Sequence, residues 1–262
     1  MVLNSRQMNL HTTIEIAGIG RAALRCVTKP AECVRLDAVW VVRDTGTKPW
    51  RESSVLTVDL EPARVVEIVR SLEGQNVHHF CATDANETLI AKQYAALGFT
   101  LSSRYFLMTR ASRPSIDVSS SLNFWRAETL ETATRISSAA GEVLLSARDL
   151  PPRRLGVRLY GAEADGRVIA WARIAQVRED TAWVDDLFTL PAFRKRGVMR
   201  QLMNFAYQDS SNFGVRETVL VCSSENLGFH LKNGYEVVAQ KLQFVAKPGL
   251  LERVRNRVRR WF

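Results

Sequence analysis

The sequence predicts an α/β (α+β) protein of two similar units, each a mixed, mostly antiparallel sheet flanked by helices. Patterns typical of strands and helices alternate, and the order strands, helix, strand, helix, strand occurs twice. Residues 111–122 separate the two occurrences, because they are rich in Ser and Pro and lack periodicity. Each unit has a helix that ends in Gly and an aromatic residue, at Gly98-Phe99 and Gly234-Tyr235. Glycine is a general helix stop, but its matching position in both units favours an internal duplication.

In the first half, turn and helix signals divide the apolar segments. A turn that contains Gly46 and Pro49 separates two alternating segments and predicts a hairpin. Pro62 is at the favoured first position of a helix, and Gly98 ends the next one. The expected elements are a helix followed by a strand at 12–27, strands at 37–43 and 53–60, a helix at 62–72, a strand at 77–83, a helix at 86–97 and a strand at 105–109.

In the second half, Asp165-Gly166 predicts a tight turn between two strands. The expected elements are a helix at 125–145, strands at 157–163, 167–175 and 181–189, a helix at 195–212, a strand at 218–223, a short helix that stops at Gly234, and a strand at 236–245. We therefore expect the first unit at 1–116, the second at 117–248 and an extension at 249–262.

Composition limits the classes of function. The chain has 262 residues, of which 46% are hydrophobic, enough for a substantial core. Its apolar runs are shorter than the ~20 residues of a membrane span, and residues 1–13 lack the pattern of a secretory signal, so we expect a cytoplasmic protein. The four cysteines lack metal-ligand spacing, so we expect reduced thiols and no metal. The net charge of +9 suits an anionic small ligand, nucleic acid or a membrane surface.

Residues 183–203 have the pattern of a strand, a turn opened by proline, and a basic loop that leads into a helix. The free N–H groups and the positive dipole end of a helix N-terminus stabilise a diphosphate. Gly197 lets the backbone approach such a group closely, and Arg194 and Arg196 add charge-assisted hydrogen bonds. The alternative interpretation is a solvated basic helix start.

Residues 123–247 resemble the GNAT superfamily of acyl-coenzyme A-dependent N-acyltransferases. Residues 184–194 resemble the family's central strand and its exit, with proline three residues before arginine. Residues 194–199 (RKRGVM) resemble its pyrophosphate loop, R/Q-x-x-G-x-G/A, with Met199 in place of the usual Gly or Ala. Asn226 and residues 232–235 (KNGY) resemble a later segment in which an asparagine precedes a helix that ends in K-x-G-F. We therefore expect two GNAT-like units.

The resemblance implies acetyl-coenzyme A as co-substrate and direct acetyl transfer to an amine in a ternary complex. The acceptor is expected to be a small-molecule or peptide amine. The expected cofactor-binding residues belong to the strand, the loop, the start of the helix and the later segment: Leu187, Phe188, Thr189, Arg194, Lys195, Arg196, Gly197, Val198, Met199, Arg200 and Asn226.

The expected catalytic residues are Asp185, Asp186 and His230. An alkyl amine with a pKa near ~10.4 is mostly protonated at neutral pH, so a base must remove a proton. Asp185 and Asp186 are successive strand residues and should point to opposite faces, and we favour Asp185 as the base. The alternative is that either aspartate caps the backbone or pairs with an arginine. His230 aligns with the family's proton-donating tyrosine, although a lone histidine on a short helix can also be structural.

The first half resembles a degenerate copy of the second. At the position of the basic loop, residues 59–64 (DLEPAR) contain two acids and no glycine, a composition that disfavours an anionic ligand. We expect this half to bind no coenzyme A, to pack on the second half and to supply part of the acceptor cleft.

Residues 249–262 have apolar residues at helical spacing with arginines between them, which predicts a basic amphipathic helix. It could dock on the body, on a second subunit as a homodimer contact, or on an anionic membrane surface or nucleic acid. Two other functions stay open: a catalytically silent GNAT-like acyl-coenzyme A sensor or interaction scaffold, and a nucleic-acid-binding module, for which the sequence carries no strong signal.

Overall fold

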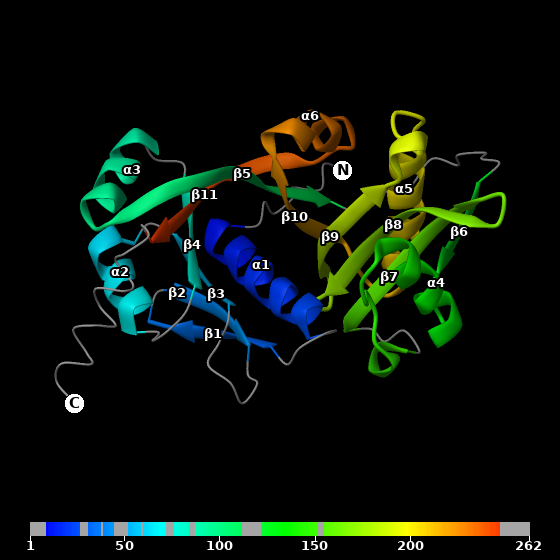
Figure 1. Cartoon of the computed structure of the whole chain (residues 1–262), viewed down its shortest axis with the longest axis horizontal. Coiled ribbons are helices and arrows are strands. Elements are labelled where there is room, and N and C mark those ends of the chain that lie inside the picture. The colour runs from blue at the N-terminus through cyan, green and yellow to red at the C-terminus, as the bar shows by residue number, and fades with distance from the viewer. Residues whose placement is uncertain are drawn as a thin grey trace, which may run out of the picture.

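A computed structural model describes residues 9–26, 31–37, 39–44, 52–58, 60–71, 76–83, 87–111, 122–150 and 155–246. In this part of the chain, eleven strands form one sheet with helices on both faces (Figure 1). The helices are α1 (Leu10–Arg25), α2 (Pro62–Ser71), α3 (Glu87–Ala96), α4 (Leu130–Ala140), α5 (Val198–Asn212) and α6 (Ser224–Lys232). The strands are β1 (Ala31–Leu36), β2 (Val39–Asp44), β3 (Glu52–Val58), β4 (Asn76–Thr83), β5 (Phe99–Ala111), β6 (Asn123–Arg126), β7 (Gly156–Ala164), β8 (Arg167–Gln176), β9 (Thr181–Thr189), β10 (Glu217–Ser223) and β11 (Glu236–Ala246). The predicted extension at 249–262 lies outside the described residues.

The strand order is β1-β2-β3-β4-β11-β5-β10-β9-β8-β7-β6. Among the described pairs, β3 with β4 and β9 with β10 are parallel and the others are antiparallel, which confirms the predicted mixed, mostly antiparallel fold class. The order is nearly symmetric about the central pair of β5 and β11. In the first half, the two antiparallel strands β1 and β2 precede a parallel pair, and in the second half the three antiparallel strands β6, β7 and β8 do so.

The two halves exchange their last strands at the centre of the sheet. β11, from the second half, pairs with β4 and β5, while β5, from the first half, pairs with β10 and β11. The sheet therefore runs continuously through both halves. The domain boundaries at 1–116 and 117–248 stay a prediction.

The expectation of a helix followed by a strand at 12–27 is wrong, because residues 10–25 form the single helix α1. Asn9 caps it, since its side chain accepts a hydrogen bond from the Thr12 N–H at 2.8 Å. The helix crosses the centre of the molecule between the two halves (Figure 1), and its buried side chains share one core with residues of both halves. The sequence did not predict β1, a short strand with two charged side chains and no alternating pattern.

The expectation of one helix at 125–145 is also wrong. Residues 123–126 form β6, which pairs with β7, and α4 begins four residues later. Thr129 starts the helix through a capping box with Thr132, and Gly141, with φ at 77°, ends it. Aromatic residues of a strand followed by a helix therefore produced an apolar pattern that resembles one longer helix.

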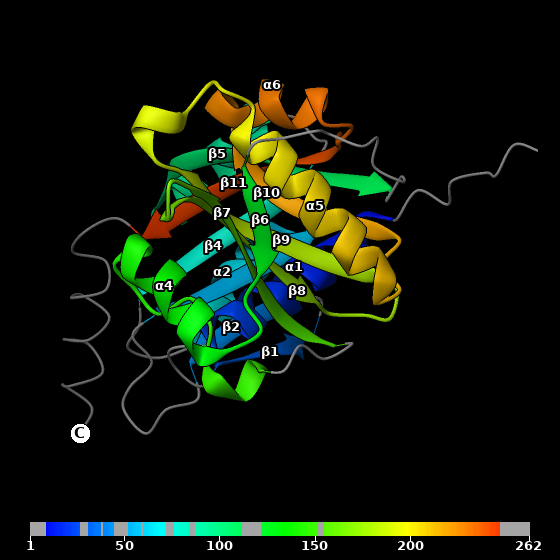
Figure 2. The same ribbon diagram turned by 90° about the vertical axis from the view of Figure 1, so that its right-hand side faces the viewer.

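Helices cover both faces of the second half. α1 and α4 pack on the side that carries Leu159, Trp171 and Trp183, whereas α5 packs on the side of Ile174 and Val184. Figure 2 shows α4 and α5 on opposite sides of the strands β6 to β9. In the first half, α2 and α3 form a further core with Val41, Val55 and other residues of the strands.

Candidate active site

The two parallel strands of the second half separate along their length. β9 and β10 pair only between residues 181–183 and 217–219, after which β9 continues beside β8 and β10 beside β5. The corresponding strands of the first half, β3 and β4, stay paired over residues 52–58 and 76–82. An opening in the sheet therefore follows Trp183 in the second half, and over the described residues of the first half β3 and β4 have no such opening between them.

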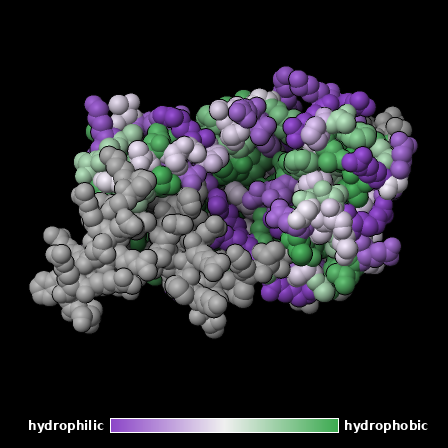
Figure 3. All heavy atoms as spheres, viewed as in Figure 1, coloured by the Kyte–Doolittle hydropathy of each residue, from purple (hydrophilic) through white to green (hydrophobic). Residues whose placement is uncertain are grey.

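A cavity of about 580 Å³ lies at this opening. Trp183 and Val221 in its wall belong to the core on the α1 side, while Val184, Leu220 and Cys222 belong to the core on the α5 side. The cavity therefore has walls on both faces of the sheet. On the face in view in Figure 3, hydrophilic side chains lie over α1 at the centre of the molecule.

Asp185 lies in the cavity wall and accepts two hydrogen bonds. One comes from the Trp183 indole N–H to Oδ2 at 3.1 Å, and the other from the Asp186 backbone N–H to Oδ1 at 2.9 Å. Both donors fix the orientation of the carboxyl group. Asp185 is therefore a positioned carboxyl group at the opening of the sheet.

Asp186 also lines the cavity, and both carboxyl groups bond to side chains on the α1 side, Asp185 to Trp183 and Asp186 to Arg173, so the expectation that the two aspartates point to opposite faces is wrong. Its φ of 51° interrupts the alternation of the strand. Its carboxylate pairs with Arg173, and the same guanidinium donates to the Leu144 carbonyl oxygen at 3.2 Å, on the α1 and α4 side. Burial and the neighbouring Asp185 charge raise the pKa of Asp186.

His230 lies on α6 and reaches the cavity from the other side of the sheet. Its side chain is 6% exposed, and its ring contacts Phe229 and Tyr235 edge to face. Burial lowers the pKa of His230 from 6.5 to about 4. The imidazole is therefore neutral at pH 7.

The basic loop follows β9 and leads into α5. Arg194 donates from Nε to the Thr189 carbonyl oxygen at 2.9 Å, and its guanidinium lies 5.4 Å from the centre of the Phe188 ring. Lys195 and Gly197 have φ angles of 62° and 78°. α5 begins at Val198 rather than at residue 195 as expected, because Gly197 is its N-cap in a left-handed conformation.

The start of α5 carries the remaining predicted cofactor-binding residues, Val198, Met199 and Arg200. The N–H groups of a first helical turn have no acceptor within the helix, so they are available to an anion. Val198 is buried, and Met199 packs partly on the same core, so the Met199 side chain belongs to the helix's inner side. Of the other predicted residues, Leu187 and Asn226 line the cavity.

Several residues of the cavity wall were not predicted, and five of them come from α1 and from the exchanged strands. Arg21 and Arg25 come from α1, Tyr105 from β5, and Lys241 and Gln243 from β11. No motif pointed to them, because α1 packing and strand exchange bring them to the site. Lys241 is 1% exposed, and burial followed by the charge of Arg21 holds its pKa well below the usual value.

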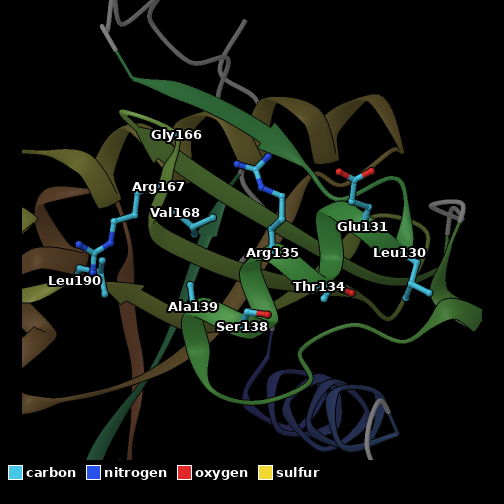
Figure 4. A pocket seen from close by; sticks show the side chains of 10 residues that line it. All are labelled: Leu130, Glu131, Thr134, Arg135, Ser138, Ala139, Gly166, Arg167, Val168 and Leu190. Atoms are coloured by element: carbon cyan, nitrogen blue, oxygen red, sulfur yellow. The ribbon is translucent and has the colours of Figure 1, made fainter.

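A second cavity, of about 720 Å³, lies between α4 and the turn that joins β7 to β8 (Figure 4). Its wall includes Arg135 and Arg167 but none of the predicted catalytic or cofactor-binding residues. Arg135 pairs with Glu163 at 2.5 Å. The cavity between β9 and β10 is therefore the better candidate, because its ionisable groups converge.

Within the described residues, no three or more His, Cys, Asp or Glu side chains form a group that suits a metal ion. In that same part of the chain, no helix has the length and apolar character of a membrane span.

Comparison with known proteins relates this site to a family. Residues 125–235 match the acetyltransferase (GNAT) family. The sequence has no match among curated proteins. The fold is similar to that of a GCN5-related N-acetyltransferase from Kribbella flavida, with a TM-score of 0.67 and 16% identity over 94% of this chain and 99% of that one.

Two further solved structures share the fold at lower similarity. A functionally unknown conserved protein from Staphylococcus epidermidis ATCC 12228 has a TM-score of 0.58 and 11% identity, over 86% of this chain and 97% of that one. A GCN5-related N-acetyltransferase from Sphaerobacter thermophilus has a TM-score of 0.52 and 14% identity, over 81% and 78%. Residues 125–235 therefore match the GNAT acetyltransferase family, within a chain whose overall fold is similar to that of a GCN5-related N-acetyltransferase.

Proposed function

We propose that the protein transfers an acetyl group from acetyl-coenzyme A to an amine, directly and within a ternary complex in the cavity between β9 and β10. The observation that carries the proposal is the separation of β9 from β10 after Trp183. It opens the sheet beside Asp185, and the basic loop and the start of α5 follow at the end of β9.

The residues around the opening suit the cofactor. A Cβ atom on Gly197 would meet only Gln201 Nε2, at 3.6 Å, so the space beside this glycine is open. In the proposed complex the diphosphate lies at the basic loop (Arg194, Lys195, Arg196, Gly197) and at the first turn of α5 (Val198, Met199, Arg200). The remainder of the cofactor is held by Asn226 and by the backbone of Leu187, Phe188 and Thr189. When bound, acetyl-coenzyme A supplies the acetyl group as a thioester.

Asp185 is the proposed general base. It is held by Trp183 and by the Asp186 backbone, on the α1 side of the opening. It removes a proton from the acceptor amine, directly or through water, because only the neutral amine has the lone pair that attacks a carbonyl carbon. Asp186 is tied to Arg173, so its proposed role is to support the local strand geometry rather than to accept the proton.

In this proposal His230 does not donate a proton to the leaving thiolate. Its pKa of about 4 leaves the ring without a proton to release at pH 7. A thiol has an ordinary pKa of ~8.5, so the leaving thiolate needs little help from an acid. We therefore propose that solvent protonates the leaving sulfur. His230 forms the wall of the cavity on the α6 side.

The first half is proposed to be a copy without a cofactor site. Its parallel strands stay paired, and Arg64, at the start of α2, pairs with Asp37 and Glu67. What this half contributes is Arg21 and Arg25 of α1, which line the cavity. We expect isothermal titration to give one acetyl-coenzyme A per chain, and two equivalent sites would contradict this assignment.

Substitution at the basic loop tests the cofactor site. Arg196→Glu should abolish acetyl-coenzyme A binding in the titration, because it reverses a charge at the proposed diphosphate position. Arg64→Glu is the matched control, since it makes the same change at the corresponding helix of the first half and should leave binding intact. Binding that survives Arg196→Glu would exclude this loop as the cofactor site.

Turnover tests the chemistry. Release of free thiol from acetyl-coenzyme A should depend on an added amine, and Asp185→Asn should reduce it by roughly a hundredfold or more without loss of cofactor binding. Tight binding without turnover of any amine would instead identify a catalytically silent acyl-coenzyme A sensor.

A further inference from the structure

Trp183 lies where the sheet opens, and it contacts both α1 and Asp185. Its side chain is 2% exposed, and its indole N–H donates to Oδ2 of Asp185 at 3.1 Å. α1 packs so closely on it that a Cβ atom on Gly20 would overlap Cβ and Cγ of Trp183. The indole therefore links a helix of the first half to the proposed base of the second half.

The sheet holds this part of β9 from one side only. Trp183 is the last residue of β9 that pairs with both neighbouring strands, with Ala175 of β8 and Val219 of β10. Asp185 pairs with Arg173 of β8, beyond the point where the register with β10 has ended. A strand with fewer backbone hydrogen bonds is held less firmly, so the position of the Asp185 carboxyl group depends more on its own hydrogen bonds.

The two donors to Asp185 differ in origin. The Asp186 N–H belongs to the backbone and bonds to Oδ1, whereas the Trp183 N–H belongs to a side chain and bonds to Oδ2. Trp183 and Asp185 are two residues apart on β9, so their side chains share a face of the strand. A carboxylate oxygen can accept two hydrogen bonds, so one bond on each oxygen leaves room for a proton from an acceptor amine.

We propose that Trp183 is a positioning residue for acetyl transfer and that α1 holds it in place through Gly20. The indole N–H keeps the Asp185 carboxyl group turned toward the opening of the sheet, and the close packing of α1 fixes the ring. This inference rests on the proposed function. It adds that a helix of the first half controls the rate of the chemistry in the second half.

Trp183→Phe tests the indole, because it keeps an aromatic ring and removes the N–H donor. Release of thiol from acetyl-coenzyme A is measured with the fastest acceptor among ethylamine, phenethylamine and putrescine. The kcat should fall by about tenfold, while the Kd for acetyl-coenzyme A from isothermal titration should stay unchanged. A kcat equal to that of the unmodified protein would overturn the proposal.

Trp125→Phe is the matched control. Trp125 lies on β6 and packs against the same core, but its indole N–H has no hydrogen-bond acceptor within the part of the chain that the structure describes. Its replacement should leave kcat unchanged. An equal fall in kcat in both variants would show that the loss of a core tryptophan, rather than the bond to Asp185, slows the reaction.

A double-mutant cycle tests whether Trp183 acts through Asp185. Asp185→Ala removes the acceptor of the indole bond. Adding Trp183→Phe to this variant should therefore change its residual rate by less than about twofold, although the same substitution costs about tenfold in the unmodified protein. Effects that simply multiply would show that Trp183 acts independently of Asp185, which would refute the positioning role.

Two glycines of α1 test the second contact and carry the test if Trp183→Phe does not fold. Gly20→Ala presses on Trp183 and should lower kcat several-fold with an unchanged Kd for acetyl-coenzyme A. Gly18→Ala is its control on the same helix, because the added Cβ atom would meet Cys33 Sγ of the first half at 2.7 Å. It should leave kcat unchanged, and equal rates in the two variants would refute control by α1.

The same measurements separate failure of this inference from failure of the proposed function. No turnover of any amine, or full activity in Asp185→Ala, would refute the proposed function and this inference with it. A large loss of rate in Asp185→Ala without a loss in Trp183→Phe would refute only the positioning role of Trp183.

Discussion

Gly197→Ala offers a sharp test of the cofactor loop, because the chain contains a matched glycine elsewhere. Gly197 has φ at 78° before α5, and Gly141 has φ at 77° after α4. An L-residue in this conformation costs roughly 1–2 kcal/mol, of which lower entropy of the unfolded chain offsets about 0.4–1 kcal/mol. Neither position adds a clash, since a Cβ atom meets nothing within 4 Å at Gly141 and only Gln201 Nε2, at 3.6 Å, at Gly197. Both variants should therefore lose about 1 kcal/mol of stability.

The two variants should differ in their affinity for acetyl-coenzyme A. A methyl group at Gly197 would displace the backbone from the diphosphate, and loss of one charge-assisted hydrogen bond costs about 1.5–3 kcal/mol, or roughly tenfold to a hundredfold in Kd. Gly141→Ala should leave the Kd unchanged. Urea unfolding measures the stability and isothermal titration measures the affinity. Equal affinities in the two variants would refute the placement of the diphosphate at Gly197.

Three other substitutions test the packing and the titration of the site. Since the pKa of His230 is about 4 in the folded chain and 6.5 ordinarily, the unfolded chain binds the proton first as the pH falls. The free energy of unfolding therefore falls below pH 6.5, by about 2.5 kcal/mol at pH 4.5. His230→Gln should lack this contribution, so its urea midpoint should fall less between pH 7 and pH 4.5 than that of the unmodified protein. Gly20→Ala should destabilise by about 1–3 kcal/mol because of overlap with Trp183, despite better helix propensity, and a more stable variant in urea would contradict the α1 packing. Asp209→Asn weakens the hydrogen bonds that Arg126 donates at 2.6 and 2.7 Å, so the free energy of unfolding should fall by about 2 kcal/mol and the thermal midpoint should fall with it. An unchanged midpoint would show that the pair contributes nothing to stability.

Local signals in the sequence located much of the fold. The turn at Asp165-Gly166 joins β7 to β8 as predicted, and both residues have positive φ, at 49° and 74°, as a tight hairpin turn requires. Pro62 opens α2 at the predicted position. Such turns and helix starts depend on a few adjacent residues, so a single sequence is enough to place them.

Part of the candidate site depends on contacts that no local pattern contains. Lys241 and Tyr105 face the same cavity because β5 and β11 change places between the halves, and Arg21 reaches it because α1 packs on Trp183. The alternation rule failed at Asp186, where a positive φ turns the carboxylate toward Arg173. These features arise from tertiary packing, which residue types and spacing do not specify.

The central position of β11 also determines when the protein can fold during its synthesis. β4 and β5 are complete once residue 111 has been made, but the strand that lies between them is residues 236–246. At a translation rate of about 5–20 residues per second, their inner edges wait on the order of ten seconds for this partner. Open strand edges recruit other chains, so the growing polypeptide is exposed to aggregation during that interval. A truncation before residue 236 would leave those edges open permanently and yield an aggregating product.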